Sequence, residues 1–78
     1  MSQALLSRNL ERGIVDAVKS VQARDGSASH KDVADWLVVY RPFLWRAVVP
    51  ESISRVTRML VGRGVLVRVG VGRFACVW

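Results

Sequence analysis

The chain has 78 residues, 51% of them apolar, which suffices for one domain with a single compact core. Its apolar runs fall short of the roughly 18 residues that span a bilayer, and the N-terminus carries no signal-peptide pattern. We therefore expect a cytoplasmic protein with no membrane partner. The one cysteine, Cys76, can form neither an internal disulfide nor a metal site by itself.

The net charge of +6 is confined to the second half of the chain. Residues 1–40 carry five basic and five acidic side chains, which cancel. Residues 41–78 carry seven arginines and one acid, Glu51, so 7 − 1 = +6. Arginine is suited to forked contacts with phosphate and guanine, so this half is expected to meet an anionic partner. A basic surface that only confers solubility is the alternative.

The first predicted element is a helix over about residues 3–24, where apolar residues recur at helical spacing and Asp25-Gly26 provides a stop. Gly13 lies inside it and predicts either a close packing contact or a break, because glycine costs roughly 1 kcal/mol relative to alanine there. Leu5 and Val15 widen the apolar stripe. A homodimer through this helix is one expectation, and ordinary scattered apolar exposure is the other.

A capping box is predicted from Ser29 to Asp32, with aspartate in the place usual for Glu or Gln. It opens a second helix over about residues 30–40. The amides at the start of this helix could hold a phosphate, helped by Ser29 and Lys31, although Ser29 could also be an ordinary cap. His30 has no cysteine or second histidine near it in the sequence, so we expect no metal or catalytic role for it.

The connection over about residues 41–49 contains Pro42, which predicts the first position of a short extra helix. The residues expected to turn inward from it are Phe43, Leu44 and either Ala47 or Val48. The rings interpreted as an aromatic satellite of the core are Trp36, Tyr40, Phe43 and Trp45. Stacking on single-stranded bases would need rings exposed together on a basic sheet, so RNA binding is a disfavoured alternative.

A third helix is predicted over about residues 51–62, after Pro50. Its inward face at helical spacing consists of Ile53, Val56 and Leu60. The polar residues on the opposite face are Ser54, Arg55 and Arg58. The sequence Gly62-Arg63-Gly64 ends the helix, because glycine readily adopts the left-handed conformation found after helices.

A two-stranded hairpin is predicted over residues 65–78, where period-two alternation surrounds the turn Gly70-Val71-Gly72. Arg68 and Arg73 flank that turn with no acid nearby in the sequence, so we expect them to lie close together and to meet phosphates or a narrow minor groove. Two solvated strand residues are the alternative. The residues expected to close the core are Phe74, Cys76 and Trp78. This placement leaves Cys76 buried and inert, with a redox-sensing thiol as the alternative.

Three segments carry a family resemblance: Ser52-Ile53-Ser54-Arg55, Leu60, and Gly64-Val65-Leu66-Val67-Arg68. Together they resemble the recognition helix and wing of bacterial winged helix-turn-helix regulators. The resemblance implies an α+β, mainly α fold over residues 1–78, with three main helices and a C-terminal two-stranded wing. It also implies that helix 51–62 lies in the major groove of DNA. The connection before that helix is longer than the family's usual three or four residues.

We therefore predict a double-stranded DNA-binding protein, a small transcriptional repressor or autoregulator associated with the nucleoid. The recognition-helix residues expected on DNA are Ser52, Ser54, Arg55 and Arg58. Those expected on the backbone, some through the wing, are Ser29, Lys31, Arg46, Arg63, Arg68 and Arg73. A protein-interaction module and a non-specific DNA-organising protein are the alternatives. No phosphate loop, metal-ligand cluster or nucleophile–base pair occurs in the sequence, so no enzyme, cofactor or small-molecule ligand is expected.

Overall fold

The structure is a computed structural model that describes residues 3–47 and 50–77. The fold is α+β and mainly helical, with a small antiparallel sheet. In chain order its elements are α1 (Gln3–Asp25), β1 (Ala28–Ser29), α2 (His30–Tyr40), α3 (Pro42–Ala47), α4 (Pro50–Gly62), β2 (Leu66–Gly70) and β3 (Arg73–Cys76). Every predicted helix is confirmed to within a residue or two. Among the described residues no helix could cross a bilayer.

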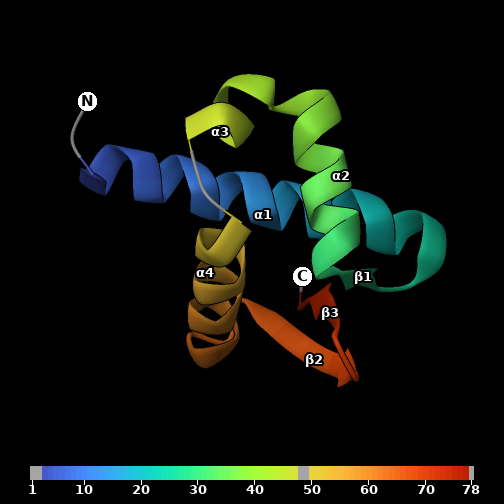
Figure 1. Cartoon of the computed structure of the whole chain (residues 1–78). Helices are drawn as coiled ribbons and strands as arrows, with labels where there is room; N and C mark the ends of the chain where they lie inside the picture. Colours follow the sequence, from blue (N-terminus) through green and yellow to red (C-terminus); the bar gives the residue numbers. More distant parts are fainter. Residues whose placement is uncertain (1–2, 48–49, 78) are drawn as a thin grey trace.

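The long helix α1 runs across the molecule, with α3 on one side and the β2–β3 hairpin on the other, while α2 crosses α1 in this view and begins beside β1 (Figure 1). The core forms where α1, α2 and α4 meet the sheet, and its α1 members are Leu10, Ile14, Ala17, Val18 and Val21. The predicted inward face of α4 is confirmed, since Ile53, Val56 and Leu60 are all buried. Val15 packs against this core from its edge.

Gly13 makes a close packing contact and does not break α1. A Cβ atom at this position would lie 2.7 Å from Cδ2 of Leu44 and 3.1 Å from Cδ2 of Leu37. The missing side chain thus leaves room for one leucine from α3 and one from α2. This contact explains why a poor helix former stands in the middle of a long helix.

The start of α2 is fixed by the predicted capping box. The hydroxyl of Ser29 accepts a hydrogen bond from the amide of Asp32 at 3.1 Å, and the Asp32 carboxylate accepts one from the amide of Ser29 at 3.0 Å. Two amides that the helix geometry leaves without partners are thereby satisfied. The prediction is confirmed, including the exchange of aspartate for the usual glutamate.

The end of α4 sets the direction of the hairpin. Gly64 has a φ of +79°, its amide donates to the carbonyl of Val61 at 3.1 Å, and the amide of Val65 donates to the carbonyl of Leu60 at 3.0 Å. These two bonds form a Schellman motif, which requires a left-handed residue after the helix. The chain therefore turns sharply and passes directly into β2.

The predicted C-terminal hairpin is present as β2 and β3, but the sheet has a third strand, β1, which the prediction missed; the strand order is β1-β3-β2. The extra strand β1 pairs Ala28 with Phe74 and Ser29 with Arg73. Two residues are too few to show period-two alternation, and their pairing depends on a strand far along the chain. The hairpin itself pairs Arg68 with Phe74 and contains an irregularity before Gly70.

The last residues of β3 are held by α1. Beyond the end of β1, the amide of Cys76 donates to the side-chain oxygen of Gln22, and the Gln22 amide group donates to the Cys76 carbonyl at 3.5 Å. The Gln22 side chain thus supplies the hydrogen-bond partners that a neighbouring strand would otherwise supply to the backbone of Cys76. Phe74 and Cys76 are buried, as predicted.

The aromatic satellite is only partly as predicted. Leu44, Trp36 and Trp45 pack against the core, but Phe43 is 85% exposed and Tyr40 is 59% exposed. The inward orientation predicted for Phe43 is wrong because α3 has only six residues and contacts α1 through Leu44 at the Gly13 position. The predictions for the side chains of Leu5, Ala47, Val48 and Trp78 fall outside the described part of the structure.

Candidate nucleic-acid interface

A groove lies between α4, the hairpin and the start of α2. Its lining residues are His30, Ser54, Arg58, Val61, Arg68 and Phe74. Three of them come from one stripe of α4, because residues four and then three apart lie on the same helix face. Ser54, Arg58 and Arg68 are all predicted DNA contacts, and the structure brings these three residues to one groove.

The hairpin register explains how the strands contribute to this groove. Arg68 and Phe74 are directly opposite each other on β2 and β3, so their side chains point to the same face of the sheet. The Schellman turn after α4 returns β2 alongside the helix, which brings Arg68 into the groove that Arg58 lines. Local backbone structure therefore brings Arg58 and Arg68 to the same groove.

His30 belongs to the groove, although the sequence pattern does not predict it as a site residue. It is the first residue of α2, and its ring packs edge-on against Phe74 with 4.9 Å between the ring centroids. This neighbour results from the pairing of β1 with β3. The only signal in the sequence was the position of His30 directly after the Ser29 cap, where the amides of a helix start point outward.

The groove carries positive charge that nearby acids do not compensate. No aspartate or glutamate is among its lining residues. Within residues 3–47 and 50–77, neither Arg58 nor Arg68 forms an ion pair, and both are exposed. Arg55 is also exposed without an ion pair in the same ranges, but it lies on the neighbouring stripe of α4, outside the groove.

Comparison of this chain with protein-family models, with curated proteins and with solved structures found no match. The groove geometry therefore carries the functional argument.

Other arginines of the chain are engaged with acids. Arg63 donates to Glu11 of α1 at 2.8 Å. Arg63 follows the last residue of α4 and stands nine positions after Ser54, about 13 Å along the helix axis at 1.5 Å per residue. It thus lies toward the far end of α4 from Ser54. Arg41 forms a similar pair with Asp16 at 3.3 Å.

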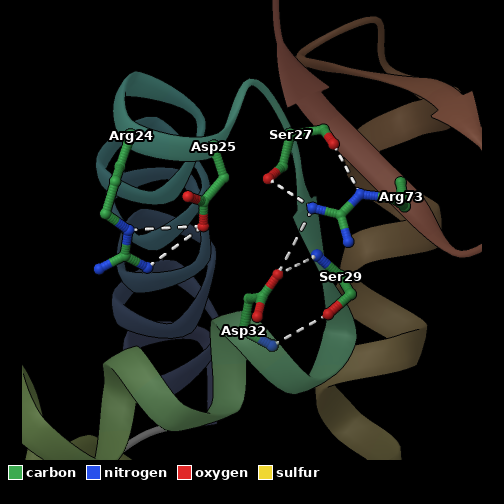
Figure 2. A network of polar contacts seen from close by, with 6 residues as sticks. All are labelled: Arg24, Asp25, Ser27, Ser29, Asp32 and Arg73. Carbon is green, nitrogen blue, oxygen red and sulfur yellow. Dashed lines mark hydrogen bonds and ion pairs between the residues drawn. The ribbon is translucent and has the colours of Figure 1, made fainter.

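Arg73 is held in a polar network beside β1 (Figure 2). Its guanidinium donates to the hydroxyl of Ser27 at 2.7 Å and to the Ser27 carbonyl at 2.9 Å, and it lies 3.7 Å from the Asp32 carboxylate. The pKa of Asp32 is lowered, chiefly by the hydrogen bond from the Ser29 amide and further by the Ser29 hydroxyl and the charges of Arg73 and Arg24.

The expectation that Arg68 and Arg73 lie close together without an acid nearby is wrong. Arg73 is paired with Gly70, one position from the Arg68–Phe74 pair, so its side chain points to the opposite sheet face from that of Arg68. The acceptors on that side come from Ser27 and Asp32, whose nearness to β3 depends on the unpredicted strand β1.

The remaining predicted contact residues surround the groove or lie away from it. Lys31 is exposed next to His30, and Ser52 is half-buried near the start of α4. Ser29 acts as the cap of α2. Arg46 is exposed on α3, which lies across α1 from the hairpin (Figure 1). Arg46 is therefore separated from the groove by the body of the domain.

The groove is lined by both hydrogen-bond donors and apolar side chains. Its lining includes two guanidinium groups, the Ser54 hydroxyl and the His30 imidazole, together with the apolar side chains of Val61 and Phe74. Such a set can bind a phosphate or the acceptor edge of a base. In the described ranges no three His, Cys, Asp or Glu side chains gather as metal ligands.

Proposed function

We propose that the chain is a double-stranded DNA-binding protein of the winged helix-turn-helix type, acting as a small transcriptional repressor or autoregulator. The observation that carries this proposal is the uncompensated pair Arg58 and Arg68 in one groove along the exposed face of α4. Phosphate neutralisation by such side chains supplies much of the affinity of DNA-binding proteins.

The dimensions of α4 support this proposal. A helix of 13 residues is about 20 Å long and, with side chains, about 10–12 Å wide, which suits a major groove of about 12 Å. In the proposed complex α4 enters that groove, and the hairpin lies on the adjacent backbone with its Gly70-Val71-Gly72 tip toward the minor groove. Strands β2 and β3 would then form the wing.

The residues of the interface divide by role. We assign Ser54 and Arg55 to base edges and Arg58 to a base or phosphate, since all three project from the outer side of α4. Arg68 is assigned to phosphate. Arg63 and Arg73 are left out of the proposed contact set because Glu11 and Asp32 engage their guanidinium groups.

The proposal is tested by selecting bound duplexes from a random-sequence DNA pool and sequencing them. An enriched motif would support a sequence-specific regulator, and inverted symmetry in the motif would indicate a two-fold dimer. Retention without enrichment would indicate a DNA-organising protein. No retention of any duplex at low salt would overturn DNA binding and leave the protein-interaction module.

A matched pair of variants checks that retained DNA occupies the groove. Arg58→Ala removes one groove arginine, and Arg24→Ala removes an equal charge from α1, where Arg24 pairs with its neighbour Asp25. We expect weakened retention for Arg58→Ala and retention close to that of the unchanged protein for Arg24→Ala. Equal losses for both would mean that net charge, and not the groove, governs binding.

A further inference from the structure

We propose that His30 is an additional phosphate-contacting residue of the groove, and that it couples DNA binding to the uptake of a proton. This inference rests on the proposed function and concerns the same groove. It adds a residue that neither the sequence pattern nor the family resemblance had placed on DNA.

The position of His30 supports a contact role. The ring is half-buried and held edge-on by Phe74, so it is already ordered before a ligand arrives. It lies in the groove that Arg58 and Arg68 also line. Among the described residues, neither ring nitrogen has a hydrogen-bond partner within the protein. An ordered imidazole without an internal partner is available to an incoming acceptor.

The charged groups around His30 indicate which acceptor this is. Arg58 faces the groove from α4 and Arg68 from β2, while Lys31 follows His30 on α2. The nearest acid along the chain, Asp32, is engaged by the Ser29 amide and Arg73. An anion that fills the groove must therefore come from outside the described chain, and a DNA phosphate matches two guanidinium groups and an imidazole.

Proton uptake follows from the chemistry of the ring. Histidine is the side chain whose charge ordinarily changes between about pH 5 and 8. A phosphate bound beside the ring brings a negative charge next to it, and a nearby opposite charge favours the protonated form. By linkage, lowering the pH through this range must then strengthen DNA binding.

The test measures affinity against pH for a fluorescein-labelled duplex of mixed sequence, about 20 base pairs long, by anisotropy at constant ionic strength. For the unchanged protein we expect roughly threefold to tenfold tighter binding at pH 6 than at pH 8, the range of one charge-assisted contact. His30→Gln keeps a hydrogen-bond donor without a titrating ring, so its affinity should vary much less with pH. His30→Lys carries a fixed charge and should bind at both pH values.

The readout is the pH dependence, so a modest loss of stability in a variant does not imitate the expected result. His30 is the sole histidine of the chain. An α-amino group also changes charge near neutral pH, but both variants keep it, so it does not account for a difference between them and the unchanged protein. A pH dependence that persists in His30→Gln, or that is absent from the unchanged protein, would overturn the proton coupling while leaving DNA binding intact. If no duplex binds at any pH, the proposed function fails first and the inference fails with it.

Discussion

The two arginines of the hairpin should behave in opposite ways when each is replaced by alanine. Arg73 makes two hydrogen bonds to Ser27 and an ion pair with Asp32, whereas Arg68 is exposed in the groove without an ion pair among the described residues. Removing Arg73 should therefore lower stability, and removing Arg68 should weaken DNA binding. Both changes remove one positive charge from the same hairpin, so each variant serves as the control for the other.

The magnitude for Arg73→Ala follows from its contacts. The Arg73 side chain is 42% exposed, so its ion pair contributes little and its hydrogen bonds fall toward the low end of their usual range. Together they give about 1–2 kcal/mol, which for a domain of this size lowers the melting temperature by about 5–15 °C. Arg68→Ala should change stability by less than about 0.5 kcal/mol.

The assay combines thermal unfolding with DNA affinity measured at several salt concentrations. Arg68→Ala should reduce the slope of log affinity against log salt by about one, and Arg73→Ala should leave that slope unchanged once the protein is folded. If Arg73→Ala unfolds at the same temperature as the unchanged protein and also flattens the salt slope, Arg73 contacts phosphate and the network of Figure 2 is not what holds it.

Three further substitutions test other parts of the argument. Arg55→Ala should cost roughly 1–3 kcal/mol at the preferred DNA site, measured by competition binding, and an unchanged affinity would remove Arg55 from the base-contacting set. Thr57 is 1% exposed, and its hydroxyl has no partner among the described residues, so Thr57→Val should raise the free energy of unfolding by about 1 kcal/mol in urea titrations; a clear loss would reveal a hidden partner. Because the pKa of Asp32 is lowered by folding, its contribution to stability is complete above its ordinary value of 3.8 and is lost as the pH falls through the folded-state value. The free energy of unfolding of Asp32→Asn should therefore depend less on pH in this acid range. A pH profile identical to that of the unchanged protein would contradict the network.

The helices could be predicted from the sequence because their signals are local. Helical spacing, the Ser29 capping box, Pro42 and the Gly62-Arg63-Gly64 stop each act within a few residues, and each determines a boundary found in the structure. The outward face of α4 followed from the same periodicity. Two of the groove residues, Ser54 and Arg58, were therefore predictable before any tertiary contact was known.

The missed features all depend on contacts between distant segments. Strand β1 has no pattern of its own, yet it brings Ser27 and Asp32 to Arg73 and places His30 against Phe74. A prediction that lacks β1 gives Arg73 no neighbouring acceptor and His30 no neighbouring ring. The exposure of Phe43 has a similar origin, because the contact between Leu44 and Gly13 decides which side of α3 faces the core.

The same distant contacts support the shape of the groove in the free protein. Gln22 of α1 binds the backbone of Cys76, and Arg73 ties the other end of β3 to Ser27, so this central strand is attached to the helical body at both ends. The Schellman turn fixes the start of β2 relative to α4. These attachments fix the backbone of the hairpin relative to α4, and a pre-positioned strand loses less conformational entropy on binding than a mobile one. A small core can therefore support such a groove, because Gln22 and Arg73, which attach β3, lie outside it and leave Arg58 and Arg68 without ion pairs in residues 3–47 and 50–77.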